Sequence, residues 1–120
     1  MPIYLFVYGT LKRSFSLHKY LQGACFLGEG YIKGFEMYDL GSYPGIVPGN
    51  GIVYGEVYQV YPADLALIDE IEAEGEEYQR RLVPVFLASG DVLEAFVYVY
   101  LGDVSLRPVV ANGIWSKKGT

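Results

Sequence analysis

The sequence has almost none of the residues from which disulfides and histidine-rich metal centres are built. Its 120 residues include one cysteine, Cys25, and one histidine, His18. A single cysteine excludes an intrachain disulfide and a cysteine-based metal cluster, and a single histidine excludes a site of several histidines. Because its neighbours are apolar, Cys25 is expected to be a buried, inert thiol. The sequence therefore predicts a functional site without a metal ion.

Positive charge and long apolar runs are also scarce. Nine basic residues face fourteen acidic ones, and the net charge of −5 argues against a surface for nucleic acid or anionic membrane. No stretch reaches the roughly 18–20 apolar residues of a membrane span. Gly9 interrupts the apolar N-terminal run that a secretory signal would need. We expect a cytoplasmic protein that binds neither nucleic acid nor membrane, and the sequence carries no signal of an oligomeric state.

Strand patterns broken by glycine are abundant instead. Residues 3–8 are continuously apolar, which predicts a strand covered on both faces. Alternating patterns predict further strands at residues 51–60, 78–87 and 92–101. Closely spaced glycines break residues 25–47 into short segments, a spacing typical of bending strands. Length and pattern together predict one α+β domain over residues 1–120, built on a small, curved sheet.

Two helices accompany these strands. Residues 16–22 fit a short helix with Ser16 as its N-cap. Residues 62–74 begin with proline and carry Asp64 in the first turn, and Gly75 is expected to end the helix. At about 100° per residue, four aliphatic side chains define its buried face: Leu65, Leu67, Ile68 and Ile71.

Glu72 is the one acid on that apolar face. The same geometry places it near 340°, between Ile68 at about 300° and Leu65 at zero. Removing a carboxylate from water costs several kcal/mol and usually raises its pKa, which would suit Glu72 to proton transfer near neutral pH. The alternative is a structural glutamate that reaches solvent or pairs with Arg80 or Arg81. The surrounding acids are expected on a solvated helix face and loop: Asp69, Glu70, Glu74, Glu76 and Glu77.

Four segments together resemble the γ-glutamylcyclotransferase-like family, most closely its γ-glutamylamine cyclotransferase branch and related uncharacterised microbial proteins. They are FVYGTLKR, GEVYQV, IDEIEAEGEEYQRRLVPV and AFVYVY, and the likeness extends over residues 3–100. YGTL alone is a weak motif. YGTL at the end of the first strand, followed in the second half of the chain by Glu72, Tyr78 and Arg80, is far more specific. The resemblance implies a small six-stranded, barrel-like mixed sheet that encloses a cavity, with a few flanking helices.

The resemblance also implies a cofactor-independent, cyclising acyltransferase whose partner is a small γ-glutamyl substrate. The α-amine of the substrate would attack its own γ-carbonyl and release 5-oxoproline and a free amine, with Glu72 as general base and then acid. The main chain at four residues would hold the γ-glutamyl group: Tyr8, Gly9, Thr10 and Leu11. Gly9, without a Cβ, permits close approach of a ligand, and successive N–H groups after a strand can form an anion-binding concavity. Tyr78 would either contact the substrate or the glutamate, or form part of the barrel wall.

Alternatives to this interpretation stay open at the level of sequence. YGTL also fits a tight turn that only leads the strand out of the sheet. Ser14, Phe15 and Leu17 depart from the residues of many relatives beside the pocket, so the released amine could be lysine-derived, a peptide amino group or a small amine. Trp115 is expected to pack the C-terminal tail over the barrel. Two other classes of function remain, a non-catalytic binder of small carboxylates and an interaction scaffold with an unused cavity.

Overall fold

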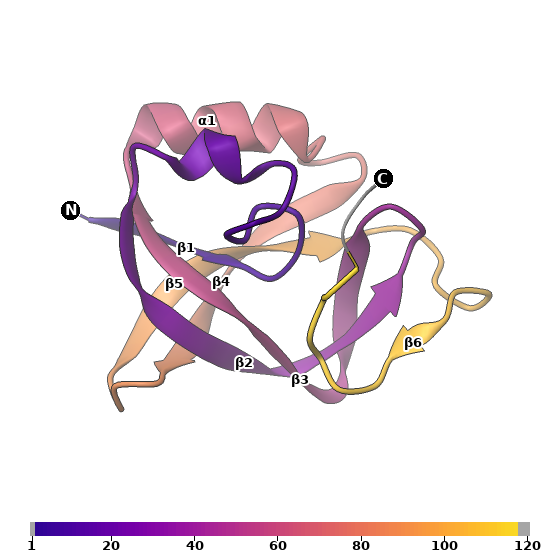
Figure 1. Ribbon diagram of the computed structural model, residues 1–120. Helices are drawn as coiled ribbons and strands as arrows, with labels where there is room; N and C mark the ends of the chain where they lie inside the picture. The colour runs from indigo at the N-terminus through magenta and orange to yellow at the C-terminus, as the bar shows by residue number, and fades with distance from the viewer. Residues whose placement is uncertain (1, 118–120) are drawn as a thin grey trace.

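The computed structural model describes residues 2–117 and shows a barrel with two helices over one side (Figure 1). Five strands close the barrel in the order β3-β1-β5-β4-β2, and β2 pairs back with β3. The sixth strand, β6, pairs only with the end of β2. The expected α+β class and six-stranded, barrel-like mixed sheet are thus confirmed. The elements along the chain are β1 (Ile3–Val7), the 3₁₀ helix η1 (His18–Leu21), β2 (Cys25–Asp39), β3 (Pro44–Val60), α1 (Pro62–Ile71), β4 (Tyr78–Leu87), β5 (Val92–Tyr100) and β6 (Val109–Val110).

Strand β1 is covered on both faces, as its continuous apolar run predicts. Phe6, and Tyr8 directly after the strand, belong to the buried cluster that fills the barrel. Leu5 and Val7 point the other way, into a second cluster that includes Ile68 of α1. The sheet is mixed because β1 runs parallel to β5, whereas the other pairings are antiparallel. The end of β1 therefore lies where the barrel interior and the helical layer meet.

Strands β2 and β3 are long and continuous, so the expectation of short, broken segments is wrong. They form one antiparallel pair whose register shifts next to Gly28 and Gly34. These glycines have φ angles of 142° and 87°, which a residue with a Cβ rarely adopts. Bulges of this kind bend a strand without ending it. The glycines that appeared to divide the segment instead curve it around the barrel.

The helices are shorter than their sequence patterns predict. Only four residues of the 16–22 segment form a helix, and Leu17 rather than Ser16 precedes it, without a side-chain cap. Helix α1 begins at Pro62 as expected but ends at Ile71. The reason is Ala73, whose φ of 51° turns the chain out of the helix before Gly75 is reached.

The sequence predicted the environment of three further side chains, and two of these predictions are wrong. Cys25 is exposed because it opens β2, whose first buried position is Gly30. Leu67 is 45% exposed, so the buried face of α1 is narrower than its four aliphatic positions suggest. Trp115 is 2% exposed and belongs to the cluster inside the barrel, in agreement with its expected packing role.

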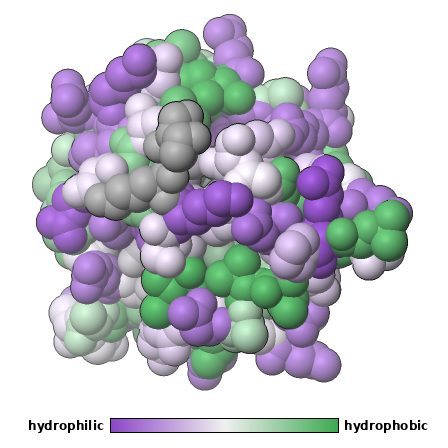
Figure 2. Space-filling view, turned by 45° about the vertical axis from the view of Figure 1, so that its right-hand side comes forward, coloured by the Kyte–Doolittle hydropathy of each residue, from purple (hydrophilic) through white to green (hydrophobic). Residues whose placement is uncertain are grey.

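The surface is mixed in character. Figure 2 shows hydrophilic groups over most of one face, with smaller apolar areas between them. Neither helix of the described residues has the length and apolar character that crossing a membrane requires.

Candidate active site

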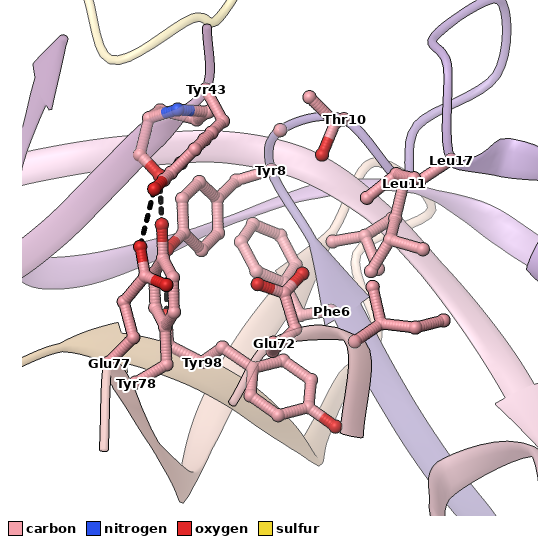
Figure 3. Close-up of a pocket in the computed structure, with 14 residues that line it drawn as sticks. Phe6, Tyr8, Thr10, Leu11, Leu17, Tyr43, Glu72, Glu77, Tyr78 and Tyr98 are labelled. Atoms are coloured by element: carbon pink, nitrogen blue, oxygen red, sulfur yellow. Dashed lines mark hydrogen bonds between the residues drawn. The ribbon is translucent and has the colours of Figure 1, made fainter. Parts of the chain in front are cut away.

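A pocket of about 180 Å³ lies where the end of α1, the segment after β1 and the β2–β3 turn meet. Its walls come from residues 6–11, 43–44, 71–72 and 77–78, together with Leu17 and Tyr98 (Figure 3). This volume is below the roughly 300–1,000 Å³ of pockets for drug-sized ligands. It suits a ligand group of about the size of one amino acid.

Glu72 extends from the end of α1 into this pocket. It is the C-cap residue, with φ −85° and ψ 0°, so its side chain still follows the helical direction. Figure 3 shows its carboxylate near the centre of the pocket. Burial, and secondly the negative charge of Glu77, raise the pKa of Glu72 from 4.5 to about 7. A carboxyl of this pKa can both take up and give back a proton near neutral pH.

The carboxylate of Glu72 has no hydrogen-bond donor or cationic partner within residues 2–117. The alternative of a pair with Arg80 is not realised, because Arg80 binds Asp69 instead. The neighbouring Glu70 and Glu74 are exposed. As the helical geometry predicted, Glu72 lies on the pocket whereas Glu70 and Glu74 do not, and no described residue compensates its charge.

The turn after β1 lies on the same pocket and keeps its amides free. Gly9 and Thr10 accept hydrogen bonds at their carbonyl oxygens, from the N–H groups of Lys12 (3.0 Å) and Leu17 (2.9 Å). In contrast, the N–H groups of Gly9, Thr10 and Leu11 donate to no atom of the described chain. Successive unpaired N–H groups of this kind can bind an anionic oxygen. The tight turn thus leads the strand out and also leaves donors available.

Gly9 is needed here for packing. A Cβ at this position would lie 2.7 Å from Cγ of Pro44, which is too close for two carbon atoms. Pro44 itself lines the pocket at the start of β3. The absence of a side chain at Gly9 therefore allows the β2–β3 turn to pack against the turn after β1. This packing requires glycine whether or not a ligand also approaches the backbone here.

Tyr8 and Tyr78 form part of the inner wall, and each hydroxyl donates to a backbone carbonyl. Tyr8 donates to the carbonyl of Tyr98, and Tyr78 to the carbonyl of Pro44, both at 2.7 Å. Burial raises the pKa of Tyr8 and of Tyr78 well above the usual 10, so both stay protonated. Since the Tyr78 hydroxyl points to Pro44, the structure places Tyr78 in the wall of the pocket and without a hydrogen bond to Glu72.

Asp69 ties the end of α1 to the barrel. Its carboxylate binds the guanidinium of Arg80 on β4 and accepts a hydrogen bond of 2.7 Å from the Tyr98 hydroxyl on β5. The expectation of a solvated Asp69 is therefore wrong, because strands that are distant in sequence supply both partners. These bonds fix the helix end from which Glu72 projects.

Several pocket residues were not predicted individually from the sequence, among them Glu77 and Tyr43. Glu77 was expected in a solvated loop. The Tyr43 hydroxyl donates to Oε1 of Glu77 at 2.5 Å, and this bond is the main cause that raises the pKa of Tyr43 to about 12. The position of Glu77 directly before Tyr78 of the motif was the only available signal. For Tyr43 the sequence offered none.

The described residues contain no group of three or more His, Cys, Asp or Glu side chains placed to hold a metal ion. The donors at hand are thus one carboxyl of raised pKa, a set of backbone amides and the Thr10 hydroxyl, which Figure 3 shows beside the pocket.

The sequence matches the model of the family described as γ-glutamyl cyclotransferase, AIG2-like, over residues 5–117. The chain belongs to this family. It is 39% identical over 111 residues to the γ-glutamylcyclotransferase family protein YtfP of Citrobacter rodentium, covering 92% of this chain and 93% of that one. The YtfP protein of Escherichia coli K12 is 38% identical over 111 residues, with 92% and 94% covered. The resemblance first drawn from four short segments is confirmed.

Solved structures agree with the family assignment. An AIG2-like protein from mouse superposes with a TM-score of 0.80 at 32% identity, over 90% of this chain and 85% of that one. The solution structure of Escherichia coli YtfP gives a TM-score of 0.72 at 38% identity, over 94% and 96%. The fold of this chain is therefore shared with these two relatives.

Proposed function

We propose that the chain is a cofactor-independent γ-glutamylcyclotransferase. The α-amine of a γ-glutamyl amide attacks the γ-carbonyl of the same molecule, the bond from that carbonyl to the leaving nitrogen breaks, and 5-oxoproline and a free amine result. The observation that carries this proposal is Glu72, a carboxyl with a pKa of about 7 that shares a small pocket with the free amides of residues 9–11.

Glu72 moves the proton in this scheme. The attacking amine must be neutral, so it must lose a proton as the new bond forms. The Glu72 carboxylate accepts that proton and, once protonated, delivers it to the leaving nitrogen. A pKa near the working pH balances the two halves of this task, and positioned proton transfer contributes typically 10²–10⁴-fold to a rate.

The backbone amides of Gly9, Thr10 and Leu11 supply the electrostatic part. As the amine attacks, negative charge develops on the γ-carbonyl oxygen, and preorganised N–H donors stabilise it. The same turn can hold the substrate carboxylate, with Tyr8 and Leu11 as the adjoining wall. Holding the two reacting groups of one molecule in a folded conformation supplies much of the remaining rate, since effective molarities can reach about 10⁵ M or more.

Glu72 also supports an enzyme over a simple binding protein. An ionised carboxylate without a partner is unfavourable in a buried pocket, and it repels an anionic ligand. A protein that only bound a small carboxylate would be better served by an uncharged side chain at this position. The unpaired acid is useful when a proton must move.

The test is release of 5-oxoproline from a panel of γ-glutamyl amines and γ-glutamyl dipeptides, followed by chromatography. We expect at least one amine to be turned over catalytically, with 5-oxoproline and amine in equal amounts. If no member of the panel is turned over, the enzyme proposal fails. Calorimetric titration with glutamate and 5-oxoproline then separates two alternatives. A binding protein gives a heat of binding with at least one of these ligands, whereas a scaffold gives none.

A further inference from the structure

The lining of the pocket is negatively charged on one side and has no cationic side chain. Of the fourteen described residues around it, Glu72 and Glu77 are ionisable acids and none is Lys, Arg or His. The basic residues that follow the YGTL turn are engaged elsewhere. Lys12 donates from Nζ to the carbonyl of Trp115 at 2.7 Å, and Arg13 pairs with Glu56. Among the described residues, an anionic group in this pocket can therefore be bound only by uncharged donors, such as the backbone amides and the Thr10 hydroxyl.

Glu77 has a fixed main chain and a carboxylate with spare capacity. Its N–H donates to Ala73 and its carbonyl accepts from Leu101, both at 2.9 Å, which holds it directly before β4. Its side chain is half-buried and receives one hydrogen bond, from Tyr43 to Oε1. No Lys or Arg of residues 2–117 forms an ion pair with it. A carboxylate can accept about four hydrogen bonds, so Oε2 remains open for a donor from a ligand.

Tyr43 holds this acceptor in place. It stands in the β2–β3 turn, and Figure 3 shows it over Glu77, on the side of the pocket away from Leu11 and Leu17. Its pKa of about 12 means that the hydroxyl stays protonated and donates to the Glu77 carboxylate. The pocket thus has a catalytic acid at its centre and a second, hydrogen-bonded carboxylate at one side.

We propose that Glu77 is a specificity-determining residue that binds a cationic group on the leaving half of the substrate. The preferred substrates are then γ-glutamyl derivatives of diamines, in which one nitrogen forms the amide and the other is an ammonium that reaches Glu77. Leaving groups that carry a carboxylate, as in acidic dipeptides, are rejected because they meet the same charge without a compensating cation. This inference rests on the proposed function, since it assigns the leaving group of that reaction.

Three substrates of matched length test the proposal. They are the γ-glutamyl amides of 1,4-diaminobutane, of pentylamine and of 4-aminobutyrate, whose tails are cationic, neutral and anionic. Hydrogen bonds to charged groups are the strong ones, so kcat/KM should fall at least tenfold from the cationic to the neutral amide and further to the anionic one. Measurements at pH 8.5 keep Glu72 mainly ionised in every variant.

Variants at Glu77 show whether that residue sets the order. In Glu77→Gln, kcat/KM for the cationic substrate should lie within about threefold of kcat/KM for the neutral one. Glu77→Lys should have its highest kcat/KM with the anionic substrate. Glu76→Gln is the matched control, because Glu76 is an exposed neighbour outside the pocket. It should leave the wild-type ratios unchanged. Equal use of the cationic and neutral amides by the wild type, or a cationic preference that survives in Glu77→Gln, would overturn the proposal.

Binding measured without turnover separates this proposal from the proposed function. In Glu72→Gln the affinities of the three amides can be measured by calorimetry, and the cationic amide should bind at least tenfold more tightly than the neutral one. That preference should vanish in the double variant with Glu77→Gln. If the preference appears in binding while the wild type releases no 5-oxoproline, the catalytic function fails and the ligand class stands. If turnover occurs without the preference, the catalytic function stands and the proposed role of Glu77 fails.

Discussion

The buried carboxylate of Glu56 and the half-buried carboxylate of Glu72 differ in their hydrogen-bond partners. Glu56 on β3 is 7% exposed and accepts from the Arg13 N–H at 3.0 Å, from Nε of Arg13 at 3.4 Å and from the Tyr58 hydroxyl at 3.0 Å. Glu72 accepts from none of the described residues, and its pKa rises to about 7. Both acids are removed from water to a large extent, but only Glu56 has donors that compensate its charge.

The carboxylate of Glu56 has a structural role, because it holds the segment that follows the YGTL turn opposite Glu72. Arg13 directly follows the turn whose amides line the pocket, and Glu56 holds its main chain and its side chain together. The turn is thus anchored from behind by one acid, while the other acid faces it across the pocket. Replacing either acid should show this division of roles.

The largest expected effect is that of Glu72→Gln on catalysis. Glutamine keeps the shape of the side chain but cannot take up a proton at neutral pH. Release of 5-oxoproline should fall at least about 10²-fold, and the rise of wild-type kcat/KM through about pH 7 should disappear. Affinity should change little, because the amides of residues 9–11 are untouched.

Glu70→Gln is the matched control for this experiment. It removes the same charge from an exposed position of the same helix and should leave the rate as it is. A folded Glu72→Gln variant that works at the wild-type rate would remove Glu72 from the mechanism.

The next effect is that of Glu56→Ala on stability. The change leaves the buried Tyr58 hydroxyl and the Arg13 N–H without an acceptor, and unsatisfied buried groups cost about 1–3 kcal/mol. The free energy of unfolding, measured by urea denaturation, should fall by about 2 kcal/mol. Glu56→Gln keeps one acceptor oxygen and should lose less. An equal loss in both variants would mean that the packing of the side chain, and not its hydrogen bonds, matters.

A smaller effect of opposite sign is expected for the stability of Glu72→Gln. The pKa of Glu72 is higher in the folded than in the unfolded chain, so the folded state holds this proton more tightly. The wild type therefore loses stability as the pH rises from about 4.5 through 7, and the glutamine variant escapes this loss. Between pH 4 and pH 8 its stability relative to wild type should increase by about 1–2 kcal/mol, since one pKa unit corresponds to about 1.4 kcal/mol and the pocket is open to some solvent. A pH-independent difference in thermal denaturation would contradict the raised pKa.

The smallest effect concerns the pH profile of Glu77→Gln. The charge of Glu77 is the second cause of the raised pKa of Glu72, after burial. Without that charge the pKa should fall, and the rise of kcat/KM for the neutral pentylamide should move to lower pH by less than about one unit. Glu76→Gln, already introduced as a control, should not move it. A shift to higher pH would show that Glu77 does not act on Glu72 through its charge.

Local sequence patterns predicted the parts of the site that depend on local geometry. The periodicity of α1 pointed Glu72 inward, and this holds although the helix ends at Ile71, because the C-cap residue keeps helical angles. The continuous apolar run of β1 placed the YGTL turn at the junction of barrel and helices. In contrast, the continuity of β2 was missed because glycines with positive φ curve a strand as readily as they end it.

Contacts between residues that are distant in sequence could not be predicted in this way. Glu56 and Arg13 are 43 positions apart, and Tyr43 and Glu77 are 34 apart. No periodicity relates residues at such separations, because only closure of the barrel brings them together. The sequence alone could therefore show which acid lay on an apolar face, but not which acid had partners.

The parallel pairing of β1 with β5 also bears on how the chain folds. Leu5 lies opposite Phe96, so the ring is completed by strands from opposite ends of the described chain. Contacts between residues so distant in sequence form slowly, because the entropy of closing the intervening loop must be overcome before they stabilise anything. The carbonyl of Tyr98 that fixes Tyr8 arrives with that same strand. During synthesis from the N-terminus, the YGTL turn thus exists long before its pocket does, because the pocket is complete only when the last long strand of the barrel, which carries Tyr98, has docked.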